Sequence, residues 1–200
     1  MIKVTLKDGS VKEFDKSLTA YDAAKEISMG LARNACAAKI NGKNCDLRTV
    51  ISDDCELEIL TFDDEYGRWT FRHTTSHIMA QAVKRLYPNA LVTIGPAVDD
   101  GFYYDFDIDE KFTPEDLVKI EEEMKKIVKE DIEITRFTMS REDAIKYFEE
   151  RKEPYKIELV ENLPEGAEIS FYTQGDFTDL CAGAHLMSTG MVKAFKLTSC

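Results

Sequence analysis

The chain has 200 residues, of which 44% are hydrophobic and 32% are charged. This composition excludes a wholly disordered chain, and the length allows one or two domains of ordinary size. Asp and Glu total 38 and Lys and Arg total 26, which leaves a formal net charge of −12. Proteins that bind nucleic acid through their overall field are usually basic, so any nucleic acid would have to be held here by a local patch.

The sequence carries no sign of a membrane protein or of a disulfide-stabilised one. No apolar run approaches the length of a membrane span, and the first residues do not lead into the apolar stretch of a signal peptide. We therefore expect a cytoplasmic protein. The cysteines form an odd set of five without the spacing of a disulfide framework, which favours reduced thiols: Cys36, Cys45, Cys55, Cys181 and Cys200.

Residues 1–62 predict a small sheet with one helix. Strands are expected where apolar and polar residues alternate or where a short apolar run lies between turn residues, at Ile2–Leu6, Val11–Phe14, Ala37–Ile40 and Cys55–Leu60. Thr19 is expected to cap a helix that stops at Gly30. The order ββαββ indicates a β-grasp (ubiquitin-like) domain. Because this part contains no histidine, it favours a binding module without chemistry of its own.

Residues 61–67 predict a linker, and residues 63–200 predict a larger α+β domain with a mainly antiparallel sheet. Helices are expected at 70–87, at 114–130 behind a Thr113 cap, and behind a Ser140 cap. Strands are expected at 91–94, 102–106, 157–160, 168–172 and 192–197. The acidic run 121–123 is expected on a solvated face.

All three histidines of the chain fall into two short pairs with the same spacing. His73 and His77 lie four residues apart on a predicted helix, so both rings point to one face. Cys181 and His185 are also four residues apart. Either pair alone is a weak signal, but the two together predict one joint site.

Two kinds of site could be built from these four side chains. Three imidazoles and a thiolate are a plausible tetrahedral zinc set, closed if all four bind and open to an activated water if three bind. Without a metal, imidazoles with a pKa near neutrality can position a water or move its proton. The residues leave both alternatives open.

Five motifs, taken in order, resemble the amino-terminal half of the bacterial threonyl-tRNA synthetase family. They are RHTTSH at 72–77, IGP at 94–96, DGFYYDF at 100–106, PYK at 154–156 and GDFTDLC at 175–181. The resemblance covers the whole chain: residues 1–62 are similar to the TGS domain of that family and residues 63–200 to its editing domain. The two pairs also resemble the editing domain of alanyl-tRNA synthetase, where they bind zinc.

The resemblance implies hydrolysis of seryl-tRNA(Thr), the product of mischarging. Serine lacks only one methyl group of threonine, which gives a first binding site about 10- to 200-fold discrimination. A second pocket that is too small for threonine would remove serine after transfer. The chain is then expected to be an amino-terminal fragment of a threonine–tRNA ligase that acts as an aminoacyl-tRNA ester hydrolase and does not aminoacylate.

The same resemblance implies the partners and cofactors. The expected partner is the acceptor end of tRNA(Thr) carrying serine, with no DNA and no membrane, and with a monomeric fragment of a homodimeric parent enzyme. The parent would need ATP, magnesium and a zinc ion in the absent catalytic domain. No cofactor is expected for the fragment itself, except that zinc is possible at the editing site.

The resemblance also assigns roles to site residues. Water and charge would be handled chiefly by His73 and Lys156, in a catalytic group that is His73, His77, Lys156, Cys181 and His185. Asp179 would hold the α-ammonium group of the substrate, and Tyr104 would contact the terminal adenosine. Without the resemblance, Lys156 would be an ordinary surface lysine and Asp179 a turn acid. Ala182 and Ala184 depart from the usual Arg and Pro of the family, which removes a possible phosphate contact.

Two alternatives stand beside the editing hydrolase. One is a zinc-binding protein that uses the two pairs as a structural or hydrolytic metal site. The other is a noncatalytic tRNA-binding module built on the β-grasp domain. The net charge of −12 argues against strong non-specific binding, because neutralisation of phosphates supplies most of that energy.

Overall fold

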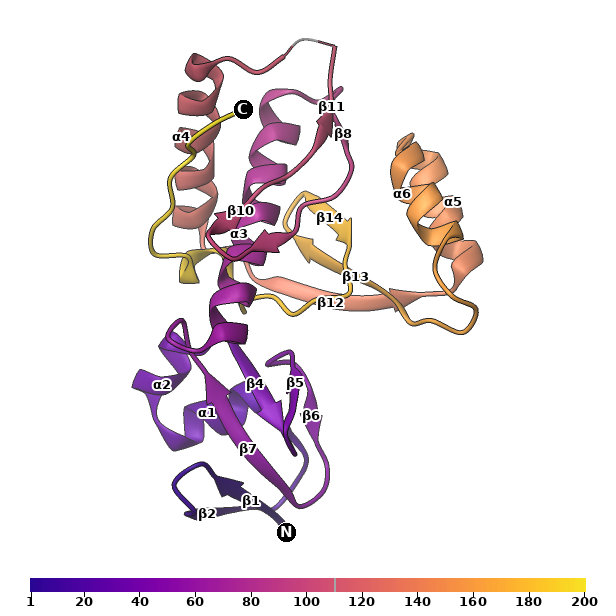
Figure 1. Ribbon diagram of the computed structural model, residues 1–200. Coiled ribbons are helices and arrows are strands. Elements are labelled where there is room, and N and C mark those ends of the chain that lie inside the picture. The colour runs from indigo at the N-terminus through magenta and orange to yellow at the C-terminus, as the bar shows by residue number, and fades with distance from the viewer. Residues whose placement is uncertain (110) are drawn as a thin grey trace. The chain divides into compact units, whose positions relative to one another are not determined.

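The computed structural model describes residues 1–109 and 111–200, which form two compact units (Figure 1). The first unit comprises Met1–His73 with Gly183–Met187, and the second comprises Thr74–Ala182 with Ser188–Cys200. Both mix helices with mainly antiparallel strands, which confirms the predicted α+β class. The predicted domain boundary between residues 62 and 63 stays a prediction.

The first unit contains a five-stranded sheet with the order β2-β1-β7-β4-β5. Its strands are β1 (Ile2–Leu6), β2 (Val11–Phe14), β4 (Ala37–Ile40), β5 (Lys43–Cys45) and β7 (Cys55–Leu60). The β1 and β7 strands run parallel, and all other neighbours are antiparallel. The β3 (Leu18–Thr19) and β6 (Val50–Ile51) strands pair separately. This arrangement is the predicted β-grasp fold, with β3, β5 and β6 added.

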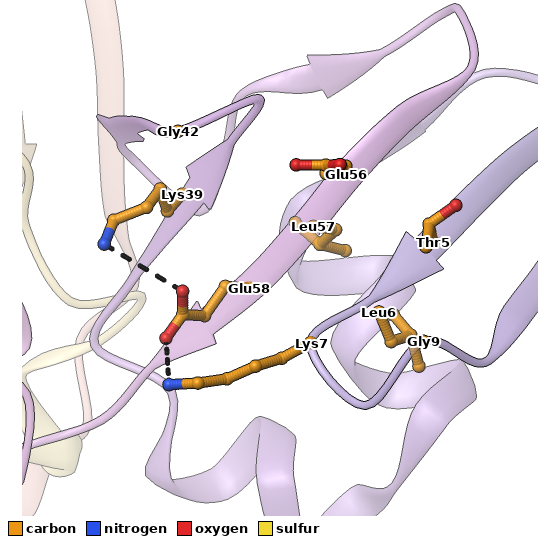
Figure 2. A pocket seen from close by; sticks show the side chains of 9 residues that line it. All are labelled: Thr5, Leu6, Lys7, Gly9, Lys39, Gly42, Glu56, Leu57 and Glu58. Atoms are coloured by element: carbon orange, nitrogen blue, oxygen red, sulfur yellow. Dashed lines mark hydrogen bonds and ion pairs between the residues drawn. The ribbon is translucent and has the colours of Figure 1, made fainter.

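A hollow of about 430 Å³ lies on this sheet, lined in part by Thr5, Lys7, Lys39, Glu56 and Glu58 (Figure 2). Both lysines reach the Glu58 carboxylate, Lys39 at 3.9 Å and Lys7 in a closer ion pair. The two lysines and two glutamates of the lining cancel in charge. The hollow therefore has no excess charge with which to select an ionic ligand.

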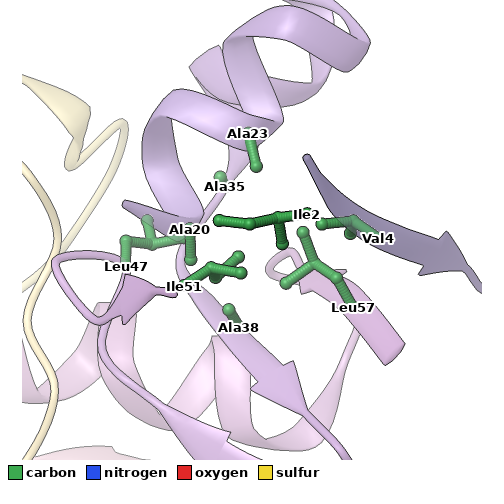
Figure 3. Close-up of a cluster of buried hydrophobic side chains, with 9 residues drawn as sticks. All are labelled: Ile2, Val4, Ala20, Ala23, Ala35, Ala38, Leu47, Ile51 and Leu57. Carbon is green, nitrogen blue, oxygen red and sulfur yellow. The ribbon is translucent and has the colours of Figure 1, made fainter. Parts of the chain in front are cut away.

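The core of the first unit lies between the sheet and α1 (Ala20–Ile27) (Figure 3). Its buried side chains are Ile2, Val4, Ala20, Ala23, Ala35, Ala38, Leu47, Ile51 and Leu57. The predicted stop of this helix at Gly30 is wrong. Ser28 ends α1 and caps a second helix, α2 (Met29–Asn34), because its hydroxyl accepts from the N–H groups of Gly30 and Leu31.

Helix α3 (Glu65–Leu86) carries the first histidine pair and belongs to the first unit as far as His73. The predicted linker is wrong in its last three residues, because Glu65, Tyr66 and Gly67 are helical. A Cβ atom on Gly67 would lie 1.8 Å from the Thr61 carbonyl oxygen. Close packing of two chain segments, and not flexibility, therefore explains this glycine.

The sheet of the second unit has three antiparallel strands, β12 (Ile134–Met139), β13 (Ile169–Gln174) and β14 (Phe177–Leu180). Two further hairpin-like pairs join β8 (Leu91–Val92) to β11 (Phe106–Asp107) and β9 (Ala97–Val98) to β10 (Gly101–Phe102). The predicted strand at 102–106 is therefore split between two partners. Tyr104 lies in the irregular segment between β10 and β11.

Three helices complete the second unit: α4 (Pro114–Glu130), α5 (Arg141–Arg151) and α6 (Pro154–Glu161). The predicted Thr113 and Ser140 caps are confirmed, and Thr113 forms a full capping box with Asp116. The strand predicted at 157–160 is wrong. Pro154 occupies the first turn of a helix there, and its apolar residues three positions apart pack against α5 and β13.

The strand predicted at 192–197 is also wrong. Among the described residues, the segment 192–197 forms no strand and pairs with none. A short 3₁₀ turn, η1 (Thr189–Met191), precedes it. The Leu197 N–H and the Lys196 ammonium instead bind the Glu121 carboxylate. Glu121 is consequently buried, which corrects the expectation that the whole 121–123 run is solvated.

Within residues 1–109 and 111–200, no helix combines the length and the apolar character that crossing a bilayer requires.

The five cysteines are free thiols, with Cys36 and Cys181 buried and Cys200 exposed.

Candidate functional site

Helix α6 places Lys156 in the interior of the second unit, where only 2% of its surface is exposed. Its ammonium group lies 2.6 Å from Asp179 Oδ1 and donates to the Thr93 carbonyl at 2.7 Å and to the Tyr104 hydroxyl at 3.1 Å. The ammonium group is therefore held by one ion pair and two hydrogen bonds. The structure thus excludes the surface-lysine reading.

Strand β14 places Asp179 beside Lys156, and this carboxylate is 2% exposed. The Tyr104 hydroxyl donates to Asp179 Oδ2 at 2.5 Å. Burial alone would raise the pKa of Asp179, but the Lys156 ammonium, the His77 ring and the two hydrogen bonds hold it below its ordinary value. Burial and the neighbouring Asp179 raise the pKa of Tyr104 well above its ordinary value. The aspartate is therefore ionised and the tyrosine neutral at pH 7.

His77 faces the same carboxylate, with Nε2 3.8 Å from Asp179 Oδ2. Burial lowers the pKa of His77 to about 4, an effect that Asp179 opposes and Lys156 reinforces. The imidazole is therefore neutral at pH 7, and its contact with Asp179 is not an ion pair there. A neutral ring keeps a lone pair that can accept a proton or a hydrogen bond.

This pKa predicts a specific pH dependence of stability. The unfolded His77 binds a proton below its ordinary pKa of 6.5, whereas the folded one does so only near 4. The neutral ring therefore stabilises the fold fully above pH 6.5, and this contribution is lost as the pH falls from 6.5 to 4, by about 3 kcal/mol in total. Urea unfolding of the wild type and of His77→Gln at pH 7 and pH 4 measures it.

The difference between the two proteins isolates His77, since the other titrating groups are common to both. Asp179 behaves differently, because its pKa is lowered from an already acidic value and its contribution disappears only below pH 4. If the difference in unfolding free energy between the wild type and His77→Gln is the same at pH 7 and pH 4, the pKa of His77 is not lowered by folding.

Glu153 and Lys84, which the sequence reasoning missed, support this network. Glu153 is buried immediately before α6, and its carboxylate accepts from the Lys84 ammonium at 2.8 Å and from the Val92 N–H at 3.4 Å. Val92 precedes Thr93, whose carbonyl receives Lys156. Glu153 and Lys156, at the start of α6, therefore both bind the backbone of the segment 92–93. The only sequence signal was an acidic residue three positions before Lys156.

His73 and His185 lie against each other in the first unit. Their ring centroids are 4.4 Å apart at an interplanar angle of 31°, and the His73 ring also contacts Trp69 at 4.7 Å. Both imidazoles are buried. Trp69 was not predicted as a site residue, although it lies one helical turn before His73 on α3.

The predicted site residues thus fall into two described groups. Lys156, Asp179, Tyr104 and His77 meet in the second unit, and His73 meets His185 in the first. Cys181, which directly follows β14, is buried with Ile134 and Tyr172.

The two predicted pairs are made of residue types that bind metal ions. His73, His77, Cys181 and His185 offer three imidazoles and one thiol, and all four side chains are buried. Three nitrogens and one sulfur are a ligand set that suits Zn²⁺. The chemistry of these donors therefore fits zinc.

Two family models match parts of the chain. Residues 2–61 match the family model of the TGS domain, and residues 169–200 match that of the threonyl and alanyl tRNA synthetase second additional domain.

Curated relatives extend the likeness over the full chain. Threonine–tRNA ligases of Acetivibrio thermocellus, Clostridium tetani and Clostridium acetobutylicum are 63%, 63% and 62% identical to it, each over 199 residues. Each alignment covers 100% of this chain but 31% of the relative. The chain therefore spans about a third of the length of the curated relatives it matches, and its predicted resemblance to their amino-terminal region is confirmed.

Proposed function

Starting from this likeness to threonine–tRNA ligases, we propose that the chain hydrolyses seryl-tRNA(Thr), the mischarged product of such a ligase. The observation that carries the proposal is the buried Lys156–Asp179 ion pair beside a neutral His77. A buried ion pair is seldom more stabilising than apolar packing of the same volume. Strongly perturbed groups gather at functional sites, so this network is better explained by chemistry than by stability.

The proposed reaction is the addition of water to the ester carbonyl carbon. The water oxygen forms the new bond, the bond from that carbon to the ribose oxygen of the terminal adenosine breaks, and the ribose oxygen takes up the proton that the water has lost. Serine and free tRNA are the products. His73 positions the water and accepts its proton, while Lys156 supplies positive charge for the oxyanion.

Asp179 is assigned to the α-ammonium group of the seryl ester. Its carboxylate is ionised and already accepts from Lys156 and Tyr104, so a substrate ammonium would join or replace one of these donors. The Tyr104 hydroxyl, held by the same carboxylate, is assigned to the terminal adenosine. His77 and His185 orient their neighbours, and Cys181 lines the pocket without forming an acyl-enzyme.

A zinc site is the second candidate, favoured by the donor set of three imidazoles and the Cys181 thiol. Bound by three of these ligands, zinc would lower the pKa of a water in its open position, and bound by all four it would be structural. In that case Lys156 and Asp179 would still bind the charged groups of the substrate.

The rest of the activity is assigned to the longer ligase. Aminoacylation, ATP, magnesium and a further zinc belong in this proposal to the part of the relatives that the chain does not match. The partner is the acceptor end of tRNA(Thr) carrying serine, and the place of action is the cytoplasm.

Single-turnover deacylation tests the proposal. The chain should hydrolyse seryl-tRNA(Thr) at least tenfold faster than threonyl-tRNA(Thr), because the added methyl group must be excluded by contact. Protein purified without chelator is assayed before and after treatment with EDTA, and its metal is measured by elemental analysis. Activity without bound zinc supports the metal-free reading, and one zinc per chain lost together with activity supports the second candidate.

Equal rates for the two esters, or tRNA binding without any turnover, would contradict the editing proposal. The latter result would leave the noncatalytic tRNA-binding module.

A further inference from the structure

A loop of the β-grasp sheet holds the backbone of His185. The segment Gly183–Met187 belongs to the same compact unit as Met1–His73. The Asp46 carboxylate accepts from the His185 N–H at 3.2 Å, and the Arg48 guanidinium donates to the carbonyls of His185 at 3.1 Å and Leu186 at 2.8 Å. Both peptide groups that flank the His185 Cα atom are therefore tied to one acid–base pair.

The pair itself is well fixed. Arg48 Nη1 lies 3.0 and 3.1 Å from the two oxygens of Asp46, and the Arg48 N–H donates to Asp46 Oδ1 at 2.7 Å. The side chains of Asp46 and Arg48 are only 11% and 16% exposed. Planar guanidinium–carboxylate pairs of this kind define direction as well as distance.

The loop that carries the pair is anchored in the core. Leu47 is completely buried in the hydrophobic cluster of the first unit (Figure 3). Its carbonyl accepts from the Tyr21 N–H at 2.9 Å, and the Thr49 carbonyl accepts from the Ala20 N–H at the start of α1. Asp46 and Arg48 therefore flank the buried residue Leu47, which holds their backbone in place.

The segment around His185 is seated on the first unit along its length. A Cβ atom on Gly183 would lie 2.4 Å from the Trp69 ring and 2.8 Å from His73 Cε1, so the chain passes closely over these rings. Met187 packs against the core of the sheet. Between them, the His185 ring lies on the His73 ring.

We infer that the Asp46–Arg48 pair is a positioning element for His185, through which the β-grasp unit takes part in editing. A peptide held at both ends has a fixed Cα–Cβ direction, and this direction decides where the imidazole lies. The inference rests on the proposed esterase function. The His185 ring lies on the ring of His73, the proposed base, so a shift of His185 would also shift His73. Displacing a reacting group by about 1 Å can cost about 100-fold in rate, so the expected effect is kinetic.

The test compares Arg48→Ala, Arg48→Lys and Asp46→Asn in the full chain, with Arg33→Ala as the matched control. Arg33 is exposed on α2, so Arg33→Ala removes the same charge from an exposed position in the same unit. We expect Arg48→Ala to lower the saturated single-turnover rate on seryl-tRNA(Thr) by about 10- to 100-fold, with little change in the half-saturating concentration. Arg33→Ala should retain the wild-type rate.

The conservative variants separate position from charge. Arg48→Lys keeps the charge beside Asp46 but loses the planar fork that reaches two carbonyls, so it should remain slow. Asp46→Asn keeps an oxygen that can accept from the His185 N–H and should retain more activity than Arg48→Ala.

Amide hydrogen exchange gives a readout that does not depend on activity. In Arg48→Ala the His185 amide should exchange faster, whereas the Cys36 amide, bonded to the Leu60 carbonyl at 2.8 Å in the same unit, should be unchanged. Equal acceleration at both amides would indicate a global loss of stability and would overturn the inference.

Three further results would also overturn it: an unchanged rate in Arg48→Ala, an equal loss in Arg33→Ala, and unchanged exchange at His185. The failure of the proposed function looks different. In that case the wild-type chain leaves seryl-tRNA(Thr) intact, while the exchange experiment still shows whether Arg48 holds His185.

Discussion

Replacing His73 by alanine is expected to slow the hydrolysis of seryl-tRNA(Thr) by about 10²- to 10⁴-fold, the contribution typical of a general base. The imidazole is buried against the Trp69 and His185 rings, and a water that entered the space left by alanine would lack the basicity of the ring. The loss should appear in the saturated single-turnover rate, since the ring is proposed to act on water and not to bind tRNA.

Chemical rescue separates catalysis from packing. His73→Ala leaves a space of imidazole size, so added imidazole should restore part of the rate. His73→Gln fills the space and should be equally slow but should not respond to imidazole. A His73→Ala protein that unfolds normally and retains most of its rate would contradict the assigned role.

Replacing Lys156 by methionine is expected to lower the free energy of unfolding by about 3–5 kcal/mol. The substitution nearly preserves the shape of the side chain but leaves the Asp179 carboxylate buried without its counter-ion. Breaking a buried pair by removing one partner typically costs that much, because the remaining charge has lost both water and its partner. Urea unfolding at pH 7 measures the loss.

The second partner provides the internal control. Adding Asp179→Asn to Lys156→Met removes the stranded charge and should restore part of the stability, while the double variant remains inactive. Lys146→Met, at an exposed position on α5, should change the stability by no more than about 0.5 kcal/mol. Equal and small losses for Lys156→Met and Lys146→Met would show that the ion pair does not form in solution.

The Lys156–Asp179 ion pair also affects how a loss of activity is interpreted. A Lys156 variant loses stability and chemistry together, whereas the double variant separates the two. Rates should therefore be measured at a temperature well below the unfolding midpoint of the weaker protein.

Local sequence signals determined the elements whose causes are local. The Thr113–Asp116 capping box, the Ser140 cap and the alternation of β1 depend on residues a few positions apart, and all three were predicted correctly. The two histidine-containing pairs were found for the same reason, since spacing along a chain can be counted.

The tertiary structure decided what depends on residues far apart. The segment 157–160 lies in helix α6, and this helix brings Lys156 inward to Asp179, 23 positions later in the chain. The Arg48 guanidinium donates to the carbonyl of His185, which lies 137 positions later in the sequence, and no sequence pattern near either residue predicts that contact. Burial and pairing of charges are properties of the folded chain. A charged side chain can be solvated by water or can pair with a distant residue, and only the folded backbone decides which of the two lies beside it.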